Sequence, residues 1–138
     1  MAQYVMQDLV DKKGLSDCFY IDSAATSREE IGERPHRGTR AKLKQMGIYC
    51  GDHRARQMTG SDYDKYDYII GMDKWNRRNM LRILGGDPEG KVSLLLDYTD
   101  HPRDIADPWY TGNFDETFDD VDEGCRAMLK SLIDEGIV

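Results

Sequence analysis

The sequence predicts an α/β fold in which a parallel, twisted sheet lies between two layers of helices. Short apolar runs bounded by Gly, Asp or Pro alternate along the chain with longer segments whose apolar residues recur at helical spacing. This alternation indicates strand–helix–strand units, which build parallel sheets that are covered on both faces. The length of 138 residues suits one domain, residues 1–138, with a continuous apolar core.

An amphipathic helix is predicted at the start of the chain. Its apolar stripe has helical spacing and is formed by Ala2, Val5, Met6, Leu9 and Val10. Gly14 can end this helix. The next apolar run, residues 18–21, is too short for a helix and rich in aromatic and branched residues, so we expect a buried strand there. A polar loop follows over residues 24–36.

The middle of the chain gives two helix signals and one strand signal. A basic helix is predicted over residues 37–46 and closes at Gly47. A short helix can begin at Thr59, where Thr-x-x-Asp resembles a capping box. Residues 66–72 form the next strand candidate, and turn-forming residues bound this segment.

The C-terminal half continues the alternation. A helix is predicted over residues 73–84 and stops at Gly85-Gly86, and a third strand is predicted over residues 92–96. A long loop over residues 97–112 then leads to the clearest helix of the chain. Its helical spacing is carried by Phe114, Phe118, Val121, Cys125, Met128, Leu129 and Leu132.

Composition and charge exclude several classes of function. Nineteen basic residues against 26 acidic residues give a net charge of −7, so the bulk charge favours neither nucleic acid nor an anionic membrane as a partner. No stretch approaches the roughly 18 apolar residues of a membrane span. The three cysteines, Cys18, Cys50 and Cys125, are widely spaced, which suits reduced cytosolic thiols better than disulfides or a zinc site. We expect a cytoplasmic protein without metal or cofactor.

The order of the elements is unusual at the N-terminus. A doubly wound domain normally begins with a strand, and the loop after that strand holds an anionic group at the N-terminus of the first helix. The present sequence begins inside the helix. We therefore expect that a segment before Met1 is absent.

Four motifs resemble the low-molecular-weight protein-tyrosine phosphatase family of bacteria. In chain order they are Asp22-Ser23-Ala24-Ala25-Thr26-Ser27, Gly47-Ile48 leading to His53-Arg54-Ala55-Arg56-Gln57, Met72-Asp73-Lys74-Trp75-Asn76, and Asp107-Pro108-Trp109-Tyr110. Together they span most of the chain. The resemblance implies a flavodoxin-like topology. It also implies hydrolysis of a phosphotyrosine-containing protein or a small phosphate monoester through a phosphocysteine intermediate.

The resemblance also says what the missing segment carries. Family members begin with an apolar strand and a Cys-x5-Arg-Ser-Pro loop, directly before a helix start that Met1-Ala2 resembles. Such a loop lowers the pKa of its cysteine and stabilises the transferring phosphoryl group. Because this chain contains no such nucleophile, we expect it to be catalytically inactive as it stands.

Asp107 is the catalytic residue that the resemblance places in this chain. It corresponds to the general acid that protonates the departing tyrosyl oxygen and then activates water. Pro108 would set the direction of the loop, and Trp109 and Tyr110 would line the substrate pocket as an aromatic wall. The plain alternative is a turn at Asp107-Pro108 whose aromatic residues cover the core.

Four other residues belong to the predicted site. By resemblance, Ser23 and His53 form a hydrogen-bond network that supports the nucleophile loop. Asp73 supports the active site by resemblance, or it serves only as a helix N-cap. We expect it to cap the helix whether or not it also supports the site. Glu29 lies in a variable substrate-contacting loop where the family often has an aromatic residue, so the peptide preference stays open.

One motif imitates the nucleophile loop. Cys50 and Arg56 formally satisfy Cys-x5-Arg, but no strand precedes them, Asp52 would point a carboxylate at the phosphate, and Gln57 replaces the expected hydroxyl residue. We therefore interpret Cys50 as an ordinary loop thiol.

Two further functions remain open alternatives. The first is a non-enzymatic interaction domain that uses the aromatic wall and the basic clusters at Arg37–Arg40 and Arg77-Arg78, which otherwise form solvated helix faces. The second, less favoured, is an arsenate reductase, whose chemistry needs additional cysteines. The sequence has no cysteine pair between Asp73 and Gly90.

The missing strand has a structural consequence. The resemblance places it between residues 18–21 and residues 66–72, so its loss exposes two strand edges. We expect these two strands to pair directly, or to form a homo-oligomer through their edges, with the helix over residues 2–10 displaced.

Overall fold

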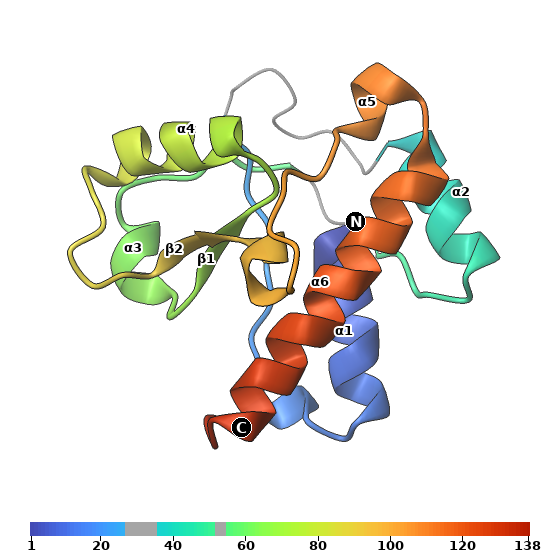
Figure 1. Cartoon of the computed structure of the whole chain (residues 1–138), viewed down its shortest axis with the longest axis horizontal. Coiled ribbons are helices and arrows are strands. Elements are labelled where there is room, and N and C mark those ends of the chain that lie inside the picture. The colour runs from blue at the N-terminus through green and yellow to red at the C-terminus, as the bar shows by residue number, and fades with distance from the viewer. Residues whose placement is uncertain (27–35, 52–54) are drawn as a thin grey trace.

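The structure is a computed structural model that describes residues 1–26, 36–51 and 55–138 (Figure 1). In chain order the elements are α1 (Ala2–Lys12), η1 (Ser16–Cys18), α2 (Arg37–Gln45), α3 (Asp62–Lys65), β1 (Ile69–Gly71), α4 (Lys74–Leu84), β2 (Val92–Leu94), η2 (Leu95–Tyr98), α5 (Pro108–Thr111) and α6 (Phe114–Asp134). Elements labelled η are short 3₁₀ helices.

Strands β1 and β2 form the centre of the fold. They pair in parallel, with Ile69 opposite Val92 and Gly71 opposite Leu94. Helix α4 connects them and packs on both. This strand–helix–strand unit confirms the predicted α/β class with a parallel sheet.

The apolar core lies on both faces of the sheet. Successive side chains of a strand point to opposite faces. Ile69 accordingly packs in a cluster with Met80 of α4 and Tyr63 of α3. Its neighbour Ile70 packs against a larger cluster built mainly by α1, η2 and α6. The three-layer arrangement predicted from the sequence is therefore present.

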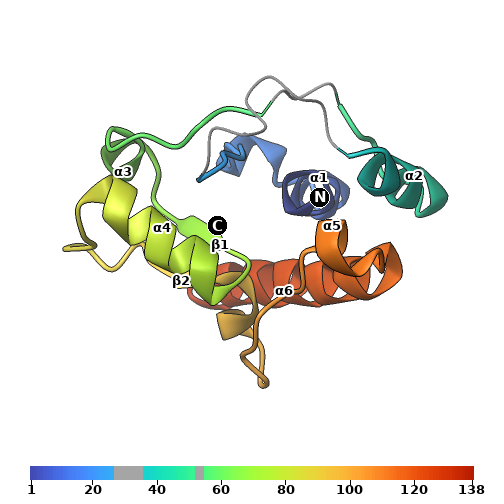
Figure 2. The same ribbon diagram turned by 90° about the horizontal axis from the view of Figure 1, so that it is seen from above.

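Helices α1 and α6 lie side by side and form most of the larger cluster (Figures 1 and 2). The buried stripe of α6 includes Val121, Cys125, Leu129 and Leu132, as the periodicity predicted. Gly124 lets η2 approach this helix, because a Cβ atom there would lie 2.5 Å from Leu95 Cγ.

The predicted helices are largely confirmed. Helix α1 ends before Gly14 and α2 ends before Gly47, and both glycines have positive φ angles. Helix α4 stops at Gly85, whose φ of 76° is the left-handed conformation that favours glycine. Helix α3 begins at Asp62, three residues later than the predicted start at Thr59. The Asp62 carboxylate nevertheless accepts the Thr59 N–H, as the Asp of a capping box does.

The predicted strand over residues 18–21 is wrong. Residues 16–18 form the 3₁₀ turn η1, and residues 19–24 belong to no strand. The chain first pairs at Ala25, in a parallel bridge to Gln57. Several residues in 19–24 are of types that favour strands, but a strand forms only where an adjacent strand supplies a ladder of hydrogen bonds.

The other two strands are shorter than predicted. β1 covers three residues of the predicted 66–72, and β2 ends at Leu94 because the backbone turns into η2. The predicted loop over residues 97–112 contains the end of η2 and the short helix α5. Two of the predicted site residues, Glu29 and His53, lie outside the described part of the chain.

Candidate active site

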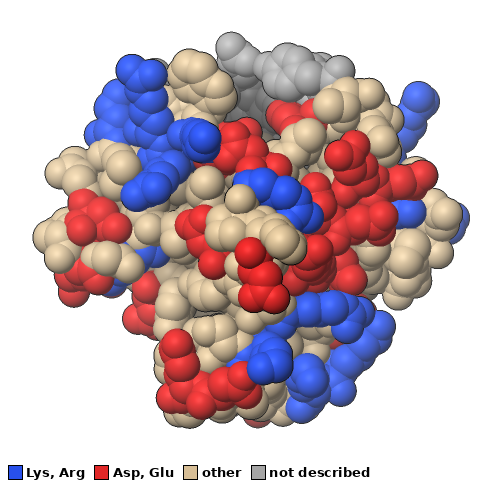
Figure 3. Space-filling view, in the orientation of Figure 1, with Lys and Arg blue, Asp and Glu red and all other residues tan. Residues whose placement is uncertain are grey.

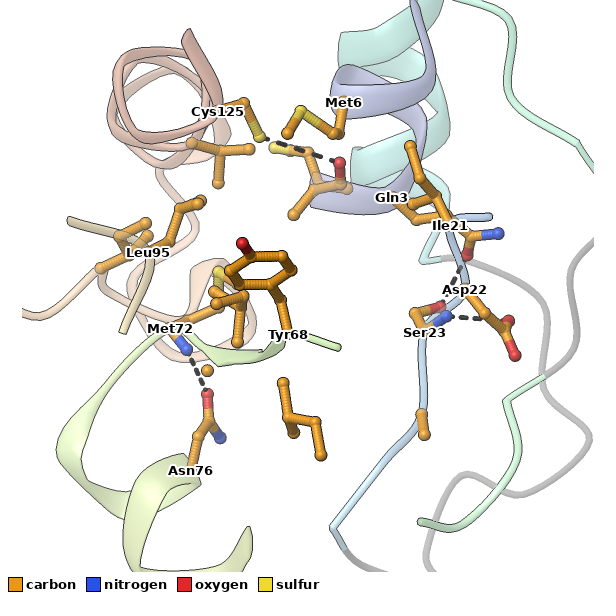
Figure 4. A pocket seen from close by; sticks show the side chains of 18 of the residues that line it. Gln3, Met6, Ile21, Asp22, Ser23, Tyr68, Met72, Asn76, Leu95 and Cys125 are labelled. Atoms are coloured by element: carbon orange, nitrogen blue, oxygen red, sulfur yellow. Dashed lines mark hydrogen bonds between the residues drawn. The ribbon is translucent and has the colours of Figure 1, made fainter. Parts of the chain in front are cut away.

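A cavity of about 1540 Å³ lies between β1 and the extended residues 19–25. Figure 4 shows Tyr68 near its middle, between Ile21 on one side and Leu95 on the other. The predicted direct pairing of the two flanking segments is therefore wrong: in the described part of the chain the cavity separates them. Three predicted site residues line the same cavity, namely Ser23, Asp73 and Asp107.

Asp107 is exposed and directly precedes α5. Pro108 occupies the first position of α5, where its fixed φ is compatible with a helix and its missing N–H costs nothing. The Asp107 carbonyl accepts the Thr111 N–H at 3.4 Å, which closes the turn.

The segment before Asp107 is held to the body of the protein at two points. The Ile105 N–H donates to the Met72 carbonyl at 2.9 Å, and the Ile105 side chain is buried. The buried Thr117 hydroxyl of α6 donates to the Ala106 carbonyl at 3.0 Å. These contacts place Asp107 near the carboxyl end of β1, where sites in parallel sheets lie.

An ion pair adds a tether farther from the cavity. The Arg103 guanidinium donates to Asp120 Oδ1 at 2.8 Å and to Glu123 Oε2 at 3.4 Å, both on α6. The backbone around Asp107 is thus fixed by a strand end and by α6. The sequence analysis did not identify these tethers.

Asp73 caps α4, as predicted. Its Oδ1 accepts the Asn76 N–H at 2.8 Å, and Asn76 Oδ1 accepts the Met72 N–H at 3.0 Å. This reciprocal pair satisfies two backbone donors at the helix N-terminus. Figure 4 shows the bond between Asn76 and Met72 at the edge of the cavity.

Ser23 joins the extended segment to the first turn of α1. Its hydroxyl donates to Gln3 Oε1 at 2.7 Å, and its N–H donates to Asp22 Oδ1 at 2.8 Å (Figure 4). In Figure 4, Gln3 and Ser23 lie on the same side of the cavity, beside Ile21. Ser23 therefore connects the extended segment to the first turn of α1.

A charged network missed by the sequence analysis lies beside the cavity. The Arg56 guanidinium donates to Asp22 Oδ2 at 3.2 Å and to Asp62 Oδ2 at 3.1 Å. The Tyr66 hydroxyl also donates to Asp22 Oδ2, at 3.2 Å. Asp22 and Arg56 lie in two of the four motifs that carry the family resemblance, but they are 34 positions apart and nothing in their spacing predicts the contact.

The network shifts the pKa values of its members. Burial by itself raises the pKa of Asp62, but the Thr59 N–H and the Arg56 guanidinium outweigh it and hold that pKa below its usual range. Burial also raises the pKa of Asp22, but hydrogen bonds from the Ser23 N–H, Arg56 and Tyr66 lower it by more, so the net pKa is below its usual range. The hydrogen bond to Asp62 does most to raise the pKa of Arg56. Both carboxylates are charged at neutral pH.

The cysteines of the described structure do not form a nucleophile site. Burial, with a smaller contribution from Asp122, raises the pKa of the Cys125 thiol to about 12. No strand precedes the half-buried Cys50 among the described residues. Arg56, which would complete its Cys-x5-Arg motif, is occupied by Asp22 and Asp62. These contacts support the interpretation of Cys50 as an ordinary loop thiol.

The remaining predicted residues cannot be placed in the site. Glu29 and His53 fall outside the described residues, and for Trp109 and Tyr110 the structure describes the backbone of α5 but not the side chains. The His53 network and the aromatic wall therefore stay predictions.

The surface carries both signs of charge (Figure 3). Blue side chains gather over α4, at the upper left of that view. Lys74, Arg77 and Arg78 of this helix are exposed, so the Arg77-Arg78 cluster is part of a solvated helix face, as predicted. In the described part of the chain, no cluster of His, Cys, Asp and Glu could hold a metal ion. None of the described helices has the length and apolarity that crossing a membrane requires.

Comparisons with known sequences agree on one family. The family model described as low molecular weight phosphotyrosine protein phosphatase matches residues 1–137. The low molecular weight protein-tyrosine-phosphatase YfkJ of Bacillus subtilis is 37% identical over 134 residues, covering 96% of this chain and 86% of that protein. The low molecular weight phosphotyrosine protein phosphatase of Saccharomyces cerevisiae is 33% identical over 137 residues, covering 94% and 84%.

Comparisons with solved structures agree with this result. The crystal structure of Bacillus subtilis YfkJ superposes with a TM-score of 0.93 at 37% identity, over 97% of this chain and 86% of that chain. The Streptococcus pyogenes enzyme SP-PTP gives a TM-score of 0.84 at 35% identity, over 95% and 82%. Because the match to YfkJ covers nearly all of this chain, α1 keeps the place it has in that relative, and its predicted displacement is wrong. The chain belongs to the low molecular weight phosphotyrosine protein phosphatase family.

Proposed function

We propose that Asp107 is the general acid of a phosphotyrosine phosphatase site in the cavity beside β1. The observation that carries this proposal is the position of Asp107. It is held near the carboxyl end of β1 by the bonds from Ile105 to Met72 and from Thr117 to Ala106, and it lines the cavity. An exposed carboxyl group on a fixed turn can reach a substrate oxygen without rearrangement of the backbone.

The proposed reaction uses Asp107 twice. As an acid it protonates the tyrosyl oxygen while the phosphoryl group moves to a thiolate. As a base it then takes a proton from the water that hydrolyses the phosphocysteine. The residues Ser23 and His53 would orient the nucleophile loop, with Asp73 at the adjacent helix start. Trp109, Tyr110 and Glu29 would contact the substrate, as the family resemblance implies.

The nucleophile is not among these 138 residues. Their cysteines are the buried Cys125, the loop thiol Cys50, and the exposed Cys18. None lies in a Cys-x5-Arg-Ser-Pro loop. We infer that the 138-residue chain by itself is catalytically silent, because the covalent nucleophile and the donors that bind the phosphoryl group supply most of the rate.

The role of Asp107 is tested in a chain that carries the opening strand and Cys-x5-Arg loop of YfkJ in front of Met1. Asp107→Ala should lower kcat by roughly 10²–10⁴, the usual contribution of general acid–base catalysis. The loss should be smaller for dinitrophenyl phosphate, whose leaving group needs little protonation, than for phenyl phosphate.

The exposed Asp104 on the same loop is the matched control, and Asp104→Ala should leave kcat close to its original value. An equal loss with both substrates after Asp107→Ala would rule out proton donation.

The inferred lack of phosphatase activity in the 138-residue chain is tested separately. Pure 138-residue protein should not hydrolyse p-nitrophenyl phosphate above a few per cent of the rate of YfkJ. Steady turnover would contradict the inference, and Cys50→Ser would then show whether Cys50 is the source. If the activity persisted in Cys50→Ser, Cys50 would not be the nucleophile.

The main alternative is a non-enzymatic interaction domain that keeps the phosphatase fold. A single domain over residues 1–138, a cytoplasmic location and a homo-oligomer through the strand edges likewise stay predictions. Light scattering of a dilute sample measures the oligomeric state directly, since a dimer has twice the mass of the 15.9 kDa chain.

A further inference from the structure

Helix α4 presents a basic face to solvent on the outside of the molecule (Figures 1 and 3). Its inner side packs on β1 and β2, and Met80 is buried there. The charged residues of the helix are all basic and all exposed: Lys74, Arg77, Arg78 and Arg82. The helix contains no Asp or Glu, although the chain as a whole has a net charge of −7. The local charge is therefore opposite to that of the protein.

These basic side chains make no ion pair with a carboxylate in the described part of the chain. Helices α1 and α6 do pair basic residues with carboxylates four positions away: Lys12 with Asp8, Arg126 with Asp122, and Lys130 with Asp134. On α4 this spacing joins like charges instead, since Arg78 stands four residues after Lys74 and four before Arg82. Like charges at this spacing destabilise a helix.

The position of the charges within α4 is also unfavourable for the helix. Lys74, Arg77 and Arg78 lie in its N-terminal half, near the positive end of the helix dipole, where cations destabilise the helix. The first turn has no acidic residue. The N-cap Asp73 is acidic, but its carboxylate already accepts the Asn76 N–H. Residues that oppose local stability in this way are expected at functional sites.

An exposed tryptophan lies among these charges. Trp75 is 68% exposed, whereas tryptophans are highly buried on average. The guanidinium carbon of Arg78 lies 5.7 Å from the centroid of the Trp75 ring, in a cation–π contact. Trp and Arg are the residue types that contribute most to binding at protein interfaces. Helix α2 is also basic, but its Lys42 pairs with Asp115 and it contains no aromatic residue.

The chemistry of this face indicates the kind of partner that it fits. Guanidinium groups form paired hydrogen bonds with carboxylates, and the ring of Trp75 offers apolar contact. With 11 residues at about 1.5 Å each, α4 is about 16 Å long, the span of about five extended residues. A planar anionic membrane would also approach the carboxylates that Figure 3 shows elsewhere on the same side, and these would repel it. A narrow acidic polypeptide avoids that repulsion.

We propose that the outer face of α4 binds an acidic segment of a partner protein, in which Glu or Asp residues flank an aromatic residue that packs on Trp75. The face is formed by Lys74, Trp75, Arg77, Arg78 and Arg82. None of these five residues lines the cavity of the candidate active site. The binding needs no nucleophile and is independent of the proposed phosphatase role.

The test uses the isotope-labelled 138-residue protein and the acetylated, amidated peptide Glu-Glu-Phe-Glu-Glu. At low salt the peptide should shift the NMR signals of the α4 backbone and of the Trp75 indole, with a Kd below about 1 mM. The signals of the C-terminal half of α6 are the internal control. Raising the ionic strength to about 1 M should weaken binding at least about 10-fold, because the Debye length falls to about 3 Å. The peptide Gln-Gln-Phe-Gln-Gln should bind at least about 10-fold more weakly than the Glu peptide.

Variants separate loss of binding from loss of folding. The double variant Arg77→Glu with Arg78→Glu should bind the Glu peptide at least about 10-fold more weakly, because like charges repel. Its Tm should be equal or higher, since acidic residues near a helix N-terminus are favourable. Lys13→Glu with Lys44→Glu, at exposed positions, has the same change in net charge and should alter Kd less than about twofold. Trp75→Ala should weaken binding about 10-fold or more.

Four results would overturn the proposal. The first is an equal Kd for the Glu and Gln peptides, and the second is an equal loss of binding in the two double variants. The third is the absence of any shift in the α4 signals at about 1 mM peptide and low salt. The fourth is a response of the α4 signals to phosphatidylserine vesicles but not to the peptide, because a membrane would then be the partner.

Discussion

Replacing Arg56 by Met tests whether the charged network beside the cavity stabilises the fold. Met keeps most of the length and apolar contact of the Arg stem but removes both hydrogen bonds from the guanidinium. Asp62, whose side chain is 9% exposed, then keeps the Thr59 N–H but loses its ionic partner. Asp22, 17% exposed, keeps the bonds from Ser23 and Tyr66.

The expected loss follows from the burial of each partner. A hydrogen bond to a charged group contributes about 1.5–3 kcal/mol when it is shielded from water. The Arg56 side chain is 37% exposed, so we place the contribution of its bond to Asp62 at the lower end of that range. The pair with Asp22 is more exposed, and solvent screening reduces its contribution to about 0.5 kcal/mol. Arg56→Met should therefore lower the free energy of unfolding by about 2 kcal/mol.

The assay is urea unfolding at neutral pH, followed by Trp fluorescence and circular dichroism. Arg77→Met on the exposed face of α4 is the control and should change the free energy of unfolding by less than about 0.5 kcal/mol. The double variant Arg56→Met with Asp62→Asn should regain about 1 kcal/mol, because a neutral Asn needs no ionic partner and still accepts the Thr59 N–H.

The stabilisation should also depend on pH in a defined direction. The pKa values of Asp22 and Asp62 are lowered in the folded protein. Their contribution is therefore complete above the ordinary Asp pKa of about 3.9 and is lost as the pH falls through the lower folded values. The difference between the original protein and Arg56→Met should shrink below about pH 4. A loss no larger than that of Arg77→Met, or strict additivity in the double variant, would refute the reasoning.

Three further substitutions and reactions test the fold. Asp73→Ala should lower the free energy of unfolding by about 1 kcal/mol in thermal melts, because it removes the N-cap of α4, whereas Asp73→Asn should cost much less. Gly124→Ala should lower the free energy of unfolding by about 1–3 kcal/mol, although Ala favours helix more than Gly does, because the new Cβ would meet Leu95. Asp119→Ala, at an exposed position of the same helix, is the control. A Tm for Gly124→Ala that equals or exceeds that of the original protein would contradict the close packing. Alkylation with iodoacetamide near pH 8 should modify the exposed Cys18 but not Cys125, whose pKa is raised to about 12, until the protein unfolds. Mass spectrometry of the peptides would detect early modification of Cys125, the contrary result.

The helices could be predicted from the sequence because their signals are local. The apolar stripes of α1 and α6 repeat at 3.6 residues per turn, and each stripe is buried as expected. Gly85 ends α4 and Asp73 begins it, because helix caps depend on residues within one turn of the end. The order of four motifs was sufficient to indicate the family, and the comparisons confirm it.

The strands needed information that no local pattern contains. Residues 18–21 have a strand-like composition, yet they form no ladder, because a strand is defined by its neighbour and the adjacent space is a cavity. The early end of β2 at Leu94 has a related cause. Leu95 and Leu96 are as apolar as a strand requires, but they are buried against α6 in a 3₁₀ turn instead.

The candidate site combines both kinds of information. The sequence by itself identified Ser23, Asp73 and Asp107 through motifs, and the capping role of Asp73 through its place before a helix. Only the tertiary structure decided that these residues share one cavity, that Thr117 holds the backbone before Asp107, and that Arg56 joins two carboxylates. Such contacts join residues far apart in the chain, and their distances depend on how the helices pack, which residue type and spacing do not encode.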